Sequence, residues 1–117
     1  MDTRLNSGEV ELFLDGARAV LKPTARAALM ISQFCGGLRE AGLRLGRYDI
    51  ETINFVIGTG LNLSDRDSKD LPDRIFRSGY QDLASPLIRF VGMLSNGGRP
   101  IDGDEERPGN EEGGTKA

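Results

Sequence analysis

Two short segments near the N-terminus alternate apolar and polar residues, and a turn sequence joins them. This period-two pattern runs through residues 8–23, GEVELFLDGARAVLKP, with Asp15-Gly16 at its centre. Asp-Gly is a preferred dipeptide for a two-residue hairpin turn. The pattern therefore predicts an antiparallel hairpin with one apolar face, on which the expected pairs are Val10 with Leu21, Leu12 with Ala19 and Leu14 with Ala17.

From residue 25 onward, apolar residues recur at the spacing of a helix rather than a strand. Thr24 and Asp49 precede two such segments and can cap their first turns. Gly60 is expected to end the third helix, and Pro86 to begin or kink the last one. The pattern predicts five short helices, at residues 25–35, 38–46, 50–60, 71–78 and within 80–95.

An isolated two-stranded hairpin is marginally stable in water, so its apolar face needs a second surface. In this chain of 117 residues, 38% of them hydrophobic, only the helices can supply that surface. We expect an α+β, mostly α fold, in which an N-terminal two-stranded β-hairpin packs on a bundle of four to five short helices. The expected organisation is a flexible N-terminus at 1–7, one globular domain at 8–98 and a disordered acidic tail at 99–117.

The distribution of charge also changes at residue 99, where the tail is expected to begin. Residues 99–117 hold six acidic and three basic residues, so they account for the whole net charge of −3. The remaining 12 acidic and 12 basic residues are interleaved along residues 1–98. Since no basic stripe is available to neutralise phosphates, we expect no nucleic-acid partner.

Candidate chemistry is sparse. The chain contains no histidine, and its single Cys35 lies in an apolar helical pattern that indicates a buried side chain. Asp65, Asp67 and Asp70 alternate with Arg66 and Lys69, which disfavours a metal site. We expect no catalytic residue, cofactor or metal, no membrane segment or signal peptide, and a cytoplasmic location.

The order of turn, cap and core residues resembles the tail assembly chaperone-like family of gene transfer agents and siphophages, also catalogued as phage tail tube proteins of gene transfer agents. The resemblance covers about residues 8–94 and departs from the family at Ala27 and Gln33, where acidic residues are frequent, and in the long charged loop at 62–70. It is carried by Gly8-Glu9-Val10, Leu14-Asp15-Gly16, Leu21-Lys22-Pro23-Thr24, Gly36-Gly37-Leu38, Asp49, Ile53, Val56, Gly60-Leu61, Gly79, Leu83, Pro86 and Phe90.

This resemblance implies a non-enzymatic role in virion morphogenesis. The protein would bind the tape measure protein in the bacterial cytoplasm and help to recruit tail tube subunits. One alternative is a structural tail tube or completion component that stays in the particle. Another is a small DNA-binding regulator built on the helices around residues 60–79, which the neutral charge of residues 1–98 disfavours.

Aromatic residues between the last two predicted helices are the candidates for partner contact. Phe76 and Tyr80 flank Gly79, and the apolar rows of both helices are already filled by other side chains. Aromatic side chains dominate protein interfaces, although two further core residues would give the same pattern. The expected partner-binding residues are Leu71, Ile75, Phe76 and Tyr80. A homo-oligomer is left open.

Overall fold

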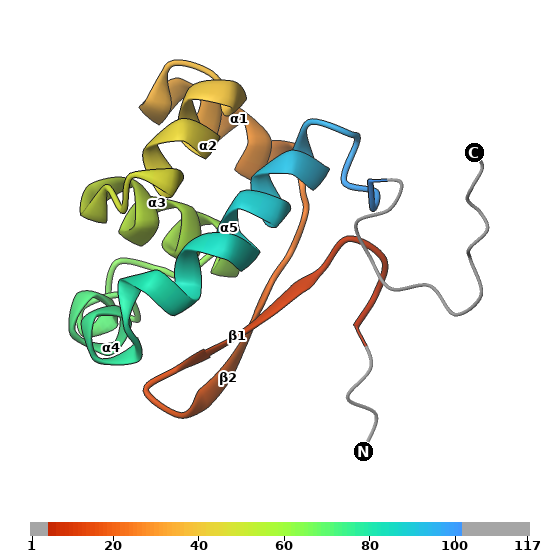
Figure 1. The fold of residues 1–117 in the computed structure, drawn as a ribbon. Helices are drawn as coiled ribbons and strands as arrows, with labels where there is room; N and C mark the ends of the chain where they lie inside the picture. Colours follow the sequence, from red (N-terminus) through yellow and green to blue (C-terminus); the bar gives the residue numbers. More distant parts are fainter. Residues whose placement is uncertain (1–4, 102–117) are drawn as a thin grey trace.

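A hairpin followed by five helices makes up the computed structural model, which describes residues 5–101 (Figure 1). The predicted α+β, mostly α class is confirmed. Most of the predicted tail, residues 102–117, and residues 1–4 lie outside the described part. The elements are β1 (Val10–Leu14), β2 (Ala17–Leu21), α1 (Ala25–Cys35), α2 (Leu38–Gly46), α3 (Ile50–Leu61), α4 (Leu71–Ser78) and α5 (Tyr80–Leu94).

The hairpin has the predicted register, with Val10 opposite Leu21 and Leu14 opposite Ala17. Asp15 and Gly16 both have positive φ, 55° and 87°, as a two-residue turn of the primed type requires. The turn is also fixed to the end of α4. The Asp15 N–H donates to Ser78 Oγ at 2.8 Å, and Arg77 Nε donates to Asp15 Oδ2 at 3.0 Å.

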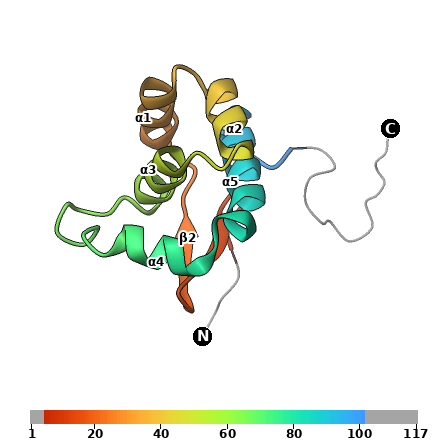
Figure 2. The same cartoon turned by 60° about the vertical axis from the view of Figure 1, so that its left-hand side comes forward.

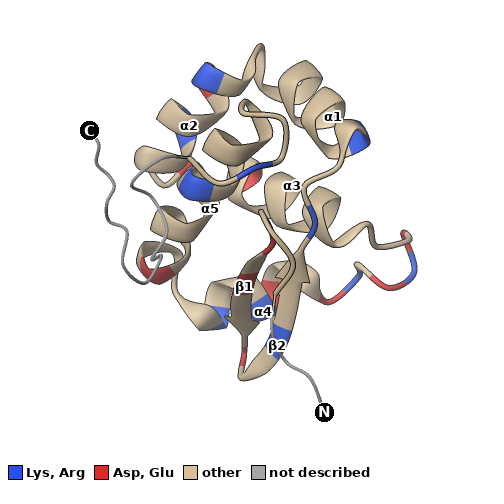
Figure 3. Ribbon diagram, turned by 90° about the vertical axis from the view of Figure 1, so that its right-hand side faces the viewer, with Lys and Arg blue, Asp and Glu red and all other residues tan. Residues whose placement is uncertain are grey.

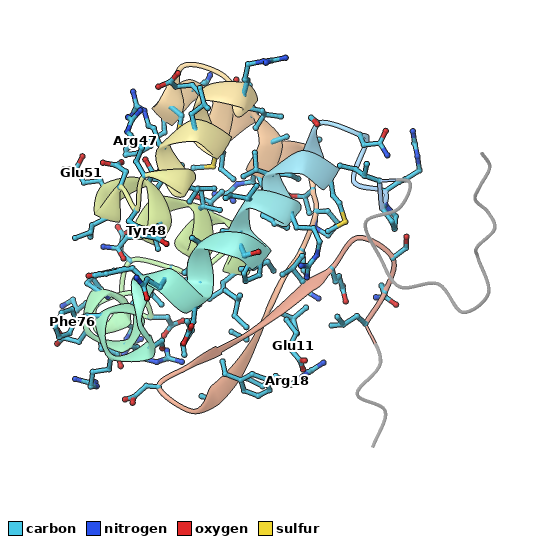
Figure 4. The ribbon with its side chains drawn as sticks, viewed as in Figure 1. Glu11, Arg18, Arg47, Tyr48, Glu51 and Phe76 are labelled. Atoms are coloured by element: carbon cyan, nitrogen blue, oxygen red, sulfur yellow. The ribbon has the colours of Figure 1, made fainter. Side chains whose placement is uncertain are left out.

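The buried residues on the apolar face of the hairpin come mainly from β1 and from the end of β2. Ala17 is exposed and Ala19 is only partly buried, so the predicted six-residue apolar face is narrower than expected beside the turn. On the opposite face, Arg18 pairs with Glu11 (Figure 4). The fully buried hairpin residues are Val10, Leu12, Leu14 and Leu21.

Side chains cap α1 and α3 as predicted. Thr24 Oγ1 accepts from the Ala27 N–H at 3.0 Å, and the Asp49 carboxylate accepts from the Thr52 N–H at 3.2 Å. At its other end, α3 continues past Gly60 to Leu61, and Asn62, whose φ is 57°, caps it. The prediction that Gly60 ends this helix is therefore wrong.

Gly60 instead allows α3 to approach the hairpin and α5 closely. A Cβ at this position would lie 2.9 Å from Leu21 Cδ2 and 3.3 Å from Phe90 Cε2, closer than side chains normally pack. The Gly60 carbonyl also accepts from the Lys22 N–H at 3.0 Å. The end of β2 is thus joined to the last turn of α3 by packing and by a hydrogen bond.

The last helix, α5, runs through the centre of the molecule. It begins at Tyr80 and continues through Pro86, so the predicted start at Pro86 is not observed. Figures 1 and 2 show α1 and α2 at one end of the molecule, the hairpin and α4 at the other, and α5 between them. Its buried residues include five at helical spacing: Leu83, Leu87, Phe90, Val91 and Leu94.

Chain segments after α5 also contact the domain. Asn96 Nδ2 donates to the carbonyls of Arg99 and Pro100, and Ile101 lies over Gly92 of α5. Residues 99–101, which the sequence assigned to the tail, therefore pack on the helical domain.

Candidate functional site

A groove of about 620 Å³ lies between α1, α3 and the loop that joins α3 to α4. From α1 it is lined by Arg26, Met30 and Phe34, which are spaced four residues apart and share one helix face. The α3 wall extends from Glu51 to Asn62, nearly the whole length of that helix.

Two contacts show that α1 and α3 run antiparallel along the groove. At one end, Arg26 Nη1 donates to Asn62 Oδ1 at 2.9 Å. Toward the other end, the rings of Phe34 and Phe55 are stacked, with centroids 4.1 Å apart and planes 5° from parallel. Phe34 remains 41% exposed despite this stacking, so the wall presents aromatic surface to solvent.

A buried polar atom also lines the groove. Asn54 Oδ1 is shielded from solvent and accepts no hydrogen bond from the described residues. An unpaired acceptor of this kind costs about 1–3 kcal/mol, because it has lost water without gaining a donor. Because Oδ1 is shielded, a ligand in the groove could reach it only after the Asn54 side chain moves.

The charges that line the groove are unequal. Glu51 and Asp65 contribute two carboxylates, and neither forms an ion pair within residues 5–101. Arg26, the cationic residue of the lining, is held by Asn62. In Figure 4 the Glu51 side chain points outward at the start of α3. The groove is therefore apolar inside and carries net negative charge.

The residues predicted to bind a partner separate into core and surface. Leu71 and Ile75 are 4% and 0% exposed, so they belong mainly to the core, although Leu71 also lines the groove. Phe76 is 65% exposed and points outward from α4 (Figure 4). Tyr80 is half-buried, and its ring meets that of Phe76 edge to face at 6.1 Å. Of the four, Phe76 offers most of the accessible aromatic surface.

Sequence reasoning missed the groove because the buried row of α1 draws attention first. Ala27, Ile31 and Cys35 form that row, while Met30 and Phe34 form a second row beside it. A second apolar row on a helix whose first row already fills the core is the signal that could have revealed the surface. Ile50 on α3 and Leu43 on α2 are also exposed.

Titratable groups give no separate sign of a reaction centre. Burial raises the pKa of the Cys35 thiol, which keeps it protonated and weakly nucleophilic. Within residues 5–101, no three side chains of His, Cys, Asp or Glu are placed to hold one metal ion. Acidic and basic residues are distributed over several elements and alternate in the loop after α3 (Figure 3).

The chain was also compared with known proteins. No protein-family model, curated protein or solved structure matches it. Among the described helices, none has both the length and the apolar character needed to cross a bilayer. The groove itself, with its exposed aromatic wall, is thus the strongest guide to function.

Proposed function

We propose that this protein is a non-enzymatic tail assembly chaperone of a phage-like particle, either a gene transfer agent or a siphophage. It acts in the bacterial cytoplasm, binds the tape measure protein and helps to recruit tail tube subunits. The groove between α1 and α3 is the observation that carries the proposal, because it offers apolar surface that the domain itself does not cover. The sequence resemblance over residues 8–94 supplies the assembly role.

The physical demand on such a chaperone matches this surface. A tape measure protein is long and helical, and apolar stripes along it would associate with one another before the tube is built. A small domain with exposed large apolar side chains can cover such stripes reversibly. Besides Phe34, the exposed large apolar residues on the helices are Leu29, Leu43, Ile50, Phe76 and Ile88.

Co-expression with the tape measure protein tests the proposal. The full chain should keep the tape measure protein in the soluble fraction and should be recovered with it by affinity purification. An unrelated acidic domain of similar size serves as the control. If the tape measure protein neither binds nor gains solubility, the chaperone proposal is wrong.

Purified particles separate the chaperone from its structural alternative. A chaperone leaves after assembly, so mass spectrometry of particles should find this chain far below the tail tube subunit. A stoichiometric amount would identify it as a tail component instead.

A further inference from the structure

We infer that the groove between α1 and α3 binds one amphipathic helix of the partner, whose apolar stripe is flanked by Lys or Arg. This inference deepens the proposed function by assigning the binding surface and the chemistry of the bound segment. It places the main contact on Phe34 and Met30 rather than on Phe76.

The shape of the groove favours a helix over a compact ligand. Its α3 wall extends from Glu51 to Asn62, twelve residues separated by eleven rises of about 1.5 Å, so the groove is about 16 Å long. That length corresponds to about three turns of a partner helix. The volume of about 620 Å³ suits the side chains of one helix face, with the partner backbone outside the groove.

The residues that line the groove indicate which apolar side chains the partner helix should carry. Met30, Phe34, Phe55 and Leu63 provide aliphatic and aromatic surface along the groove. Large apolar side chains at helical spacing would bury this surface, as in other helix-in-groove complexes.

The charges that line the groove indicate which residues should flank the apolar stripe of the partner helix. Glu51 and Asp65 have no ion-pair partner within residues 5–101. Arg26 donates to the neutral Asn62 and keeps its positive charge, so the two carboxylates leave the lining with one net negative charge. A helix with basic flanks would meet two carboxylates, whereas acidic flanks would be repelled. The bound segment should therefore be basic on both sides of its apolar stripe.

A designed peptide tests this assignment without the tape measure protein. It has fourteen residues, with Leu and one Trp on a single helix face and Lys on the flanks; a matched peptide carries Glu for every Lys. Because the protein contains no Trp, peptide fluorescence reports binding directly. The Lys peptide should bind the full chain saturably with a blue shift, and the Glu peptide at least threefold more weakly.

Paired variants locate the site. On α1, Phe34→Asp should raise the peptide Kd at least tenfold, whereas Leu29→Asp, at an exposed position outside the groove, should change it less than twofold. In the loop, Asp65→Lys should weaken binding about threefold at low salt, with Asp67→Lys as the control that changes net charge equally. Circular dichroism checks folding, and Met30→Asp replaces Phe34→Asp if the latter unfolds.

The outcomes separate this inference from the proposed function. Absence of saturable peptide binding, or equal effects of Phe34→Asp and Leu29→Asp, would overturn the groove assignment. If the tape measure protein binds the wild type and the Phe34→Asp variant equally, the groove is not its site, although the chaperone role stands. If the peptide binds as expected and the tape measure protein does not bind, the groove stands and the proposed partner is wrong.

Discussion

The twelve residues of α3 form two faces that lie in different surroundings. Ile53 and Ile57 are fully buried, and Gly60 lies against Leu21 of the hairpin and Phe90 of α5. Phe55 and Asn54 lie on the other side, in the wall of an open groove. The first face holds the fold together, and the second presents apolar surface that no described element covers.

This difference shows that one helix of a small domain can stabilise the fold through one face and bind a partner through the other. Closely packed side chains on the inner face cannot change without disturbing their neighbours. Side chains on the outer face keep exposed area that only a partner can bury. Substitutions on the inner face should therefore change stability, and substitutions on the outer face should change binding.

The largest expected contrast is between two phenylalanines. Phe90 is fully buried on α5 against the inner face of α3, so Phe90→Ala should lower the free energy of unfolding by about 3–5 kcal/mol. Phe34→Ala, in the groove wall, should cost less than about 1.5 kcal/mol, mainly through the lost stack with Phe55. Urea denaturation followed by circular dichroism measures both. Similar losses for the two variants would contradict the division of α3 into closed and open faces.

Two glycines of α3 give a contrast of opposite sign. At Gly60 a new Cβ would press on Leu21 and Phe90, so Gly60→Ala should destabilise the protein by about 1–2 kcal/mol despite the better helix propensity of Ala. At Gly58 the nearest atom to a new Cβ is Leu71 Cδ2 at an ordinary 3.5 Å. Gly58→Ala should therefore stabilise the protein by about 0.5–1 kcal/mol. The same denaturation measurement decides, and a gain in stability at both positions would show that Gly60 is not tightly packed.

The smallest expected effect concerns the Asp49 cap at the N-terminus of α3. Thr52 donates its hydroxyl and its backbone N–H to Asp49, and these hydrogen bonds lower the pKa of that carboxyl. Because the folded-state pKa lies below the unfolded value of about 3.9, ionised Asp49 stabilises the fold above that pH. This contribution is lost as the pH falls through the lowered folded-state pKa.

Thr52→Val removes the hydroxyl donor from a fully buried position. It should cost about 1 kcal/mol at pH 7 and less at pH 3, where Asp49 is protonated in the unfolded chain and its ionised form therefore stabilises the fold less. Unfolding curves at both pH values provide the measurement, with Asp49→Asn as the variant that should remove the pH-dependent part. A loss that is equal at both pH values would mean that the hydroxyl does not act through the carboxylate.

Local rules were sufficient for most of the fold. The Asp15-Gly16 turn set the register of the hairpin, and Thr24 and Asp49 set where two helices begin. Each of these features depends on residues close together in sequence. Where only long-range packing decides, as at Gly60 between Leu21 and Phe90, sequence reasoning gave the wrong role.

The candidate site was harder to predict for the same reason. Of the two aromatics for which the sequence left core and surface open, Phe76 is exposed, whereas Leu71 and Ile75 are largely taken up by the core. The groove requires α1 and α3 to lie antiparallel, with Phe34 stacked on Phe55, and no local pattern shows which helices will be neighbours. A second apolar row on α1 is visible in the sequence, yet its partner helix is not.

Amide chemical shifts of the ¹⁵N-labelled full chain, recorded with and without a tape measure fragment, test the central claim most directly. We expect the amide chemical shifts to change along α1, along α3 and in the loop at residues 62–70, and those of β1 and β2 to remain unchanged. Changes confined to the hairpin, or to Phe76 and Tyr80, would contradict the assignment of the outer face of α3 as the binding surface.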